Sequence, residues 1–189
     1  MTRDLIEGAR LVSPLFVGFF LHGVCIRLDL LGWLAKPVDN GAYLRGRRLF
    51  GDNKTYRGIV CVAVGTALGF LILSWATGSY ASAESSLVLG PRVGILGFAV
   101  GAVAMLSELP NSALKRQLDI RPGAQSSGFR GALFHVLDQL DVLVGAWLVL
   151  CPFVQVTAGM LLGSAIFMYL GHQAITLLGY LLGMRAGAR

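Results

Sequence analysis

One apolar stretch decides the fold class: residues 132–154 read ALFHVLDQLDVLVGAWLVLCPFV. A helix needs about 20 mainly apolar residues to cross the hydrocarbon core of a bilayer, and this stretch is long enough. Two acidic residues, Asp138 and Asp141, interrupt it one helical turn apart. Charged side chains are costly inside a membrane segment and are rarely kept there without a function. The stretch therefore predicts a membrane helix that carries a functional pair of carboxylates.

Four further apolar stretches lie at residues 11–35, 59–77, 93–109 and 157–184. Hydrophobic residues make up 55% of the 189-residue chain, and the mean hydropathy is +0.68. A small soluble core could not bury that much apolar material. Only helices and closed barrels span membranes, and the stretches show no strand-like alternation. We expect an all-α, polytopic membrane bundle of five transmembrane helices, with residues 1–189 forming one domain.

The basic residues are distributed unevenly between the predicted loops. Twelve of the 16 Lys and Arg residues lie between the first and second stretches, between the third and fourth, or after the fifth, and three lie on the other side. Positive residues collect in cytoplasmic loops. The N-terminus is therefore predicted outside, with the C-terminus and two loops, at about 36–58 and 111–131, in the cytoplasm. The segment 78–90, rich in Ser and Ala, is predicted to be an external connection.

Pairs of glycines spaced four residues apart recur in the apolar stretches, at 65 and 69, 97 and 101, 159 and 163, and 179 and 183. Small residues at this spacing let the backbones of membrane helices approach closely. The pairs have two explanations, which are packing within one bundle and a seam between two copies in a homodimer.

The first predicted loop carries residues suited to phosphate. Its segment 46–58 reads GRRLFGDNKTYRG, in which basic residues alternate with glycines and a Thr just before a helix. Arg offers a fork of donors for phosphate oxygens, Lys offers a point charge, and the start of a helix offers free N–H groups. The loop is not a Walker A sequence. A basic loop held to anionic lipid headgroups is the alternative interpretation.

The acidic residues are expected to meet at one depth. Glu108 lies at the end of the third predicted helix, and the fourth helix starts from the same face. Asp138 then lies about 10 Å from that face, at about 1.5 Å per residue. Glu108, Asp138 and Asp141 would share the end of the bundle beside both basic loops. They could form ion pairs that help the helices insert, or bind a divalent cation beside phosphates held by Lys and Arg.

Four segments together resemble the CDP-archaeol synthases, a membrane branch of the CTP:phosphatidate cytidylyltransferases: KPVDNG at 36–41, RRLFGDNKTYRG at 47–58, SALKR at 112–116 and LDQLD at 137–141. The resemblance implies a transferase that condenses CTP with a membrane lipid phosphate, of the archaeol or the diacylglycerol type, using Mg²⁺. Its products would be a CDP-activated lipid and pyrophosphate, and no nucleic acid would take part. Arg45 stands where the family usually has Asp, which indicates a divergent branch.

The same resemblance implies roles for single residues. Asp138 and Asp141 would bind the metal, with Glu108 as a further candidate ligand. The catalytic group would comprise Asp138, Asp141, Lys115 and Arg116, in which the two basic residues neutralise the lipid phosphate or the departing pyrophosphate. The nucleotide would be bound by Arg47, Arg48, Gly51, Lys54, Thr55, Arg57, Gly58, Asn111 and Ser112. The active site would face the cytoplasm at the cell membrane.

Three histidines and two other functions stay open. His135, one turn before Asp138, could contact metal or phosphate or could simply lie near water at the start of a helix. His22 and His172 are expected to form hydrogen bonds between helices. A membrane acyltransferase would also need a phosphate-binding loop, and a cation channel or transporter could use the acids as an ion path.

Overall fold

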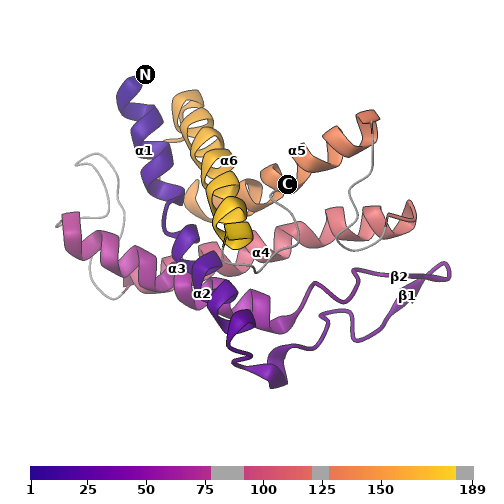
Figure 1. The fold of residues 1–189 in the computed structure, drawn as a ribbon. Helices are drawn as coiled ribbons and strands as arrows, with labels where there is room; N and C mark the ends of the chain where they lie inside the picture. Colours follow the sequence, from indigo (N-terminus) through magenta and orange to yellow (C-terminus); the bar gives the residue numbers. More distant parts are fainter. Residues whose placement is uncertain (78–91, 121–127, 182–189) are drawn as a thin grey trace.

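The computed structural model describes residues 1–77, 92–120 and 128–181 (Figure 1). Its elements are α1 (Thr2–Val12), α2 (Leu15–Arg27), the 3-10 helix η1 (Gly32–Leu34), β1 (Tyr43–Leu44), β2 (Arg47–Arg48), α3 (Tyr56–Thr77), α4 (Arg92–Gln117), α5 (Gly128–Leu150) and α6 (Ala158–Leu181). The expected helical class is confirmed, with one short antiparallel hairpin added in the first loop. The segment 78–90, predicted to be external, lies outside the described residues.

Four described segments are long and apolar enough to span a membrane: Thr2–Arg27, Tyr56–Thr77, Arg92–Gln117 and Ala158–Ile175. The chain is therefore a multi-pass membrane protein. The fourth apolar stretch is helical as α5, but α5 is not among these four candidate spans. A fifth span and the orientation of the two termini stay predictions.

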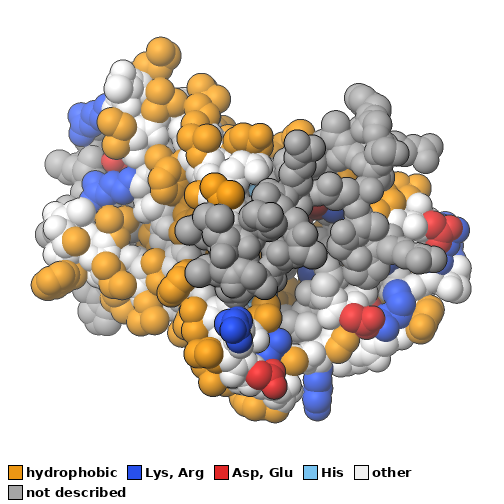
Figure 2. All heavy atoms as spheres, viewed as in Figure 1, with side chains coloured by type: hydrophobic (Ala, Val, Ile, Leu, Met, Phe, Trp, Pro, Cys, Tyr) orange, Lys and Arg blue, Asp and Glu red, His pale blue; other side chains and the backbone are white. Residues whose placement is uncertain are grey.

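The helices form two groups. In Figure 1, α1 and α6 lie beside each other and rise from a layer that contains α2, α3 and α4. Helix α5 packs on α4 and leads the chain to α6. The core where the groups meet contains Leu11, Leu15, Phe70, Val100 and Trp147, all buried. Hydrophobic side chains also cover much of the visible surface in Figure 2, as a lipid-facing protein requires.

The prediction of one helix over 11–35 is wrong at both ends. Helix begins at Thr2, is interrupted at Pro14 and ends at Arg27. Proline has no backbone N–H and cannot complete the hydrogen-bond ladder of a helix interior. After Arg27 the chain turns through Asp29, whose φ is 48°, which a right-handed helix does not allow. The first membrane segment therefore starts earlier in the sequence than its apolar run does.

The predicted end of the third helix near Pro110 is also wrong, because α4 continues to Gln117. The last turns of α4 are fixed by the first loop, since Arg116 Nε donates to the backbone oxygen of Phe50 at 3.1 Å. This contact stabilises the helix beyond Pro110, although a proline usually ends a helix. Much of the predicted loop 111–131 is consequently helical, with 111–117 in α4 and 128–131 in α5.

Three of the glycine pairs lie at helix contacts inside the chain. A Cβ at Gly65 of α3 would lie 2.6 Å from the Cα of Gly18 on α2. A Cβ at Gly163 of α6 would overlap the backbone of Leu5 on α1, and the pair at 97 and 101 faces α3 in the same way. Packing within one bundle thus explains three of the four pairs. The fourth pair lies outside the described side chains, and a homodimer stays a prediction.

Candidate active site

Four polar residues lie on one face of the C-terminal half of α4: Glu108, Asn111, Ser112 and Lys115. Their spacing of three, four and seven residues from the first places them one above another along the helix. Helix α5 packs against this half of α4, where Ser107 Oγ donates to the backbone oxygen of Asp141 at 2.6 Å. The contact brings the acidic pair of α5 to the polar face of α4.

Asn111 joins the two acids. Its Nδ2 donates to Asp138 Oδ1 at 2.7 Å and to Asp141 Oδ2 at 2.9 Å. Lys115 Nζ donates to both carboxylate oxygens of Asp138, at 2.5 Å for Oδ2. The structure therefore brings together Asp138, Asp141, Asn111 and Lys115, which were predicted as metal ligands, a nucleotide ligand and a catalytic lysine. Ser112, also predicted to bind the nucleotide, is buried next to Asn111 on the same helix.

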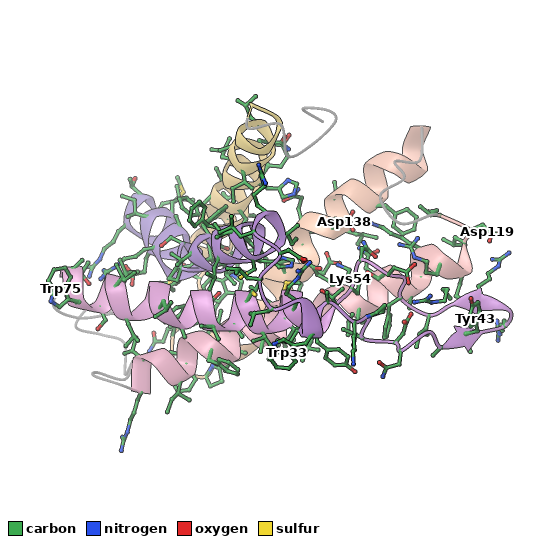
Figure 3. The ribbon with its side chains drawn as sticks, turned by 60° about the horizontal axis from the view of Figure 1, so that its bottom comes forward. Trp33, Tyr43, Lys54, Trp75, Asp119 and Asp138 are labelled. Atoms are coloured by element: carbon green, nitrogen blue, oxygen red, sulfur yellow. The ribbon has the colours of Figure 1, made fainter. Side chains whose placement is uncertain are left out.

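A second ion pair lies beside this cluster, between Lys54 of the first loop and Glu108 of α4. Both side chains are largely buried, with 19% and 18% exposed. In Figure 3, Lys54 and Asp138 project toward the same region from the start of α3 and from α5. The described residues contain no cluster of three acidic, His or Cys side chains that could hold a metal ion. Glu108 is paired with Lys54, and its role as a metal ligand stays a prediction.

The cluster nevertheless fits a divalent cation. Among the described residues, three buried side-chain oxygens have no hydrogen-bond partner, and two of them, Oδ1 of Asp141 and Oδ1 of Asn111, lie in this cluster. Leaving a buried polar atom unpaired is costly, so such atoms often mark a missing ligand. Carboxylate and amide oxygens are the ligands that Mg²⁺ prefers in proteins. The candidate ligands are therefore Asp138, Asp141 and Asn111, the last of which the sequence had indicated only for the nucleotide.

Two of the N–H groups at the start of α3 are not free, contrary to the expectation from the sequence. Thr55 caps the helix, because its Oγ1 accepts from the N–H of Gly58 at 3.2 Å. The N–H of Tyr56 donates to the backbone oxygen of Lys36 at 3.1 Å. The expectation of an open helix terminus is therefore wrong for these two groups. A contact of Thr55 or Gly58 with the nucleotide stays a prediction.

Asp39 organises the first loop, and sequence reasoning gave it no role. Its buried carboxylate accepts from the N–H groups of Gly41 at 3.0 Å, Phe50 at 3.0 Å and Gly51 at 3.2 Å. Arg48 Nη2 donates to it at 2.9 Å. Burial alone raises the pKa of Asp39, but these hydrogen bonds outweigh burial and hold the pKa well below its usual range. The loop is thus built around one ionised carboxylate.

Two local signals could have revealed this role of Asp39. An Asp two residues before a glycine favours an Asx turn, in which the side chain accepts from the backbone N–H two residues on. Gly41 has a φ of 83°, which glycine adopts readily. Gly51, predicted to contact the nucleotide, has a φ of 95° and directs its N–H at Asp39. The conformation of the loop and the contact with Asp39 therefore explain why residue 51 is a glycine.

Of three predicted phosphate or catalytic arginines, Arg47 and Arg116 connect this loop to α4, and Arg48 binds within the loop. Arg47 Nη2 lies 2.5 Å from Asp119 Oδ2, beyond the end of α4. Arg48 binds Asp39, which raises the pKa of the guanidinium. Arg116 donates to the backbone oxygens of Phe50 and Ile120. In Figure 3 the labels of Tyr43 and Asp119 mark the end of the molecule where hairpin and α4 meet. A role for these arginines in binding CTP stays a prediction.

Arg57, another predicted nucleotide ligand, contacts the turn that follows α2. Arg57 Nη1 lies 3.4 Å from Asp29 Oδ1 and donates to the backbone oxygen of Leu30 at 3.2 Å, so it holds the turn after α2. The interhelical hydrogen bond expected for His172 is confirmed, with Gln139 of α5 at 3.0 Å from its Nδ1. The side chain of His135 lies outside the described part of the chain.

The sequence model of a family described as CarS-like, CDP-archaeol synthase, matches residues 27–187. The chain belongs to this family. It is 30% identical to the CDP-archaeol synthase of Pyrobaculum aerophilum over 185 residues, which cover 96% of this chain and 97% of that protein. It is 32% identical to the CDP-archaeol synthase of Methanosarcina mazei over 169 residues, which cover 79% and 88% of the two chains.

The fold is also similar to a solved structure described as "Structural insight into an intramembrane enzyme for archaeal membrane lipids biosynthesis". The TM-score is 0.67 at 23% sequence identity, covering 92% of this chain and 94% of that one. Membership of the CDP-archaeol synthase family confirms the predicted resemblance and enzyme class, a CTP-dependent cytidylyltransferase that makes a CDP-activated lipid. Its substrates are CTP and a lipid phosphate. The acyltransferase and channel alternatives find no support.

Proposed function

We propose that the cluster between α4 and α5 is the active site of a Mg²⁺-dependent enzyme that joins CTP to an archaeol-type lipid phosphate. Asp138, Asp141 and Asn111 would hold the metal. One observation carries this assignment, namely the two partnerless buried oxygens of Asp141 and Asn111 beside a pair of carboxylates. The archaeol-type lipid is proposed because the curated relatives are CDP-archaeol synthases.

Lys54 and Lys115 would bind the phosphates of CTP. Each ammonium group now contacts a carboxylate, Lys54 on Glu108 and Lys115 on Asp138. Their side chains are 19% and 16% exposed, so their charges are screened less than those of surface lysines. A lysine is a point charge that adapts to phosphate oxygens in several positions. Both lysines can therefore exchange a carboxylate for a phosphate without leaving the site.

The reaction needs positioning more than acid or base catalysis. An oxygen of the lipid phosphate attacks the α-phosphorus of CTP, and a new P–O bond forms. The bond between the α-phosphorus and the oxygen bridging to the β-phosphate breaks, and pyrophosphate leaves with the bonding electrons. The attacking phosphate is already ionised, so orientation and neutralisation of charge lower the barrier. A bound Mg²⁺ supplies part of that neutralisation.

The site is proposed to face the cytoplasm, where CTP is available. This side is supported by the basic residues, twelve of which belong to the predicted cytoplasmic segments and three to the other side. The first loop and the C-terminal half of α4, which frame the site, both lie on the predicted cytoplasmic side.

An assay with purified protein tests the function. Protein in detergent is incubated with Mg²⁺, labelled CTP and either archaeol phosphate or phosphatidic acid, and pyrophosphate and CDP-lipid are measured. We expect pyrophosphate release that requires a lipid phosphate, with archaeol phosphate the better substrate. Release without any lipid phosphate, or no release at all, would contradict the proposal. The variant Asp138→Asn serves as the inactive control.

A further inference from the structure

His22 lies on α2 and faces the first turn of α3. A Cβ placed at Gly58 would lie 3.3 Å from Cε1 and 3.4 Å from Nε2 of the His22 ring, so the ring packs directly against this glycine. The ring is half-buried. Within the described residues it forms no hydrogen bond, contrary to the interhelical bond expected from the sequence. A polar ring is thus held within the first candidate membrane segment without a hydrogen-bond partner among the described residues.

Arg57 provides a second polar group on the same side of α3. Its Nη1 holds the turn at Asp29 and Leu30, which directly follows α2. Its Nε is buried and has no hydrogen-bond partner among the described residues. Gly58, against which the His22 ring packs, directly follows Arg57 in the sequence. The two polar groups therefore lie near each other, between the end of α2 and the start of α3.

This place lies between the lipid and the active site. On α2 and just after it, Phe20, Ile26 and Leu28 are 71%, 51% and 62% exposed, which marks a surface for lipid chains. In the other direction, Gly58, against which the His22 ring packs, is four residues from Lys54, whose ammonium group pairs with Glu108 beside the acidic pair. A phosphate beside His22 could therefore keep its hydrocarbon chains in the bilayer while it faces the metal and nucleotide residues.

We propose that His22 and Arg57 bind the phosphate of the lipid substrate and present it to CTP. The proposal rests on the proposed function and names the binding site of its second substrate. A phosphate needs hydrogen-bond donors and positive charge, which the imidazole N–H and the guanidinium supply. The family model matches residues 27–187, which include Arg57 but not His22.

Binding is measured directly, without turnover. Purified protein in detergent micelles is titrated with archaeol phosphate, with archaeol that lacks the phosphate, and with CTP plus Mg²⁺. The variant His22→Phe keeps a ring of similar shape and removes its hydrogen bonds. We expect its dissociation constant for archaeol phosphate to rise about 10- to 100-fold, as for loss of a hydrogen bond to a charged group. Its affinity for archaeol and for CTP should stay unchanged.

Two further variants separate ligand binding from packing. His22→Gln restores a donor and should recover part of the affinity for archaeol phosphate. Cys25→Ala, one turn along α2 and buried beside Cys61, loosens the same helix contact and should leave that affinity unchanged. An unchanged affinity in His22→Phe, or an equal loss for CTP, would overturn the inference. Wild-type protein that binds archaeol phosphate yet releases no pyrophosphate would refute the proposed function alone.

Discussion

Replacing Asp39 by Asn should release the first loop from the rest of the protein. The carboxylate is fully buried and accepts three backbone N–H groups in addition to the Arg48 guanidinium. Oδ1 faces the N–H of Gly41, and Oδ2 faces those of Phe50 and Gly51. An Asn amide has one oxygen only, so in either orientation its NH₂ group would face other donors.

The structure also sets the size of the effect. Removing one partner of a buried ion pair typically costs about 3 to 5 kcal/mol, and here three backbone N–H groups also lose their charged acceptor. Every 1.4 kcal/mol corresponds to about a factor of ten, so opening of the loop should become more frequent by about two to four decades. Asp52 is the matched control, because it also lies 2.8 Å from Arg48 but is 78% exposed. An exposed pair contributes less than about 1 kcal/mol, so Asp52→Asn should have little effect.

Hydrogen exchange followed by mass spectrometry measures this opening in detergent-purified protein. Peptides from the loop should lose protection at Phe50 and Gly51 in Asp39→Asn, while peptides from α3 and α4 keep theirs. Binding of CTP should weaken in parallel, because Lys54 belongs to the same loop. Unchanged protection at these amides, or equal losses in the Asp39 and Asp52 variants, would refute the role of the buried carboxylate.

Lowering the pH should destabilise the first loop, because it protonates Asp39. The pKa of Asp39 is lowered in the folded protein, so its ionisation stabilises the loop fully above the ordinary pKa of about 3.9. The stabilisation is lost as the pH falls from there through the lowered folded value. Loop protection, corrected for intrinsic exchange, should therefore be constant from about pH 5 to 8 and decrease only below about pH 4. In Asp39→Asn this acid dependence should disappear.

Two further predictions concern CTP and helix packing. Lys54→Ala should weaken binding of CTP with Mg²⁺ about 10- to 100-fold in calorimetric titration. The reason is that the Lys54 ammonium group, paired with Glu108, lies beside the acidic pair. An unchanged dissociation constant for CTP would place the nucleotide elsewhere. Gly163→Ala should lower the thermal unfolding temperature in detergent, because its Cβ would overlap the backbone of Leu5, whereas Gly23→Ala, with nothing within 4 Å of its Cβ, should not. Equal temperatures for the two glycine variants would contradict the close contact of α1 and α6.

The helical plan could be predicted because hydrophobic length belongs to each segment alone. The stretch at 59–77 matches α3, which starts three residues earlier where Thr55 caps it. The extension of α4 past Pro110 could not be predicted in this way. It depends on contacts between Arg116 and a loop more than 60 residues earlier in the chain. Such partners leave no local pattern, and they override the usual effect of proline.

The same distinction applies to the candidate site: its local features could be predicted, and its contacts between distant segments could not. The spacing of Asp138 and Asp141 on one helix is local, and it correctly indicated two side chains on one face. The part of Asn111 in joining them was not visible, because it depends on how α4 and α5 pack. Arg47 resembled a free phosphate ligand in the sequence, whereas in the structure it pairs with Asp119, 72 residues later. Charge patterns indicate which groups are present but not which partners they find.

Metal binding in the presence of CTP tests the central assignment most directly. Mn²⁺ in place of Mg²⁺ is titrated into purified protein with CTP, and bound Mn²⁺ is followed by electron paramagnetic resonance. We expect Asp141→Asn to bind Mn²⁺ at least about tenfold more weakly than the wild type while its circular dichroism stays helical, and the exposed-acid control Asp52→Asn to bind normally. Wild-type affinity for Mn²⁺ in Asp141→Asn would contradict a metal site at the acidic pair of α5.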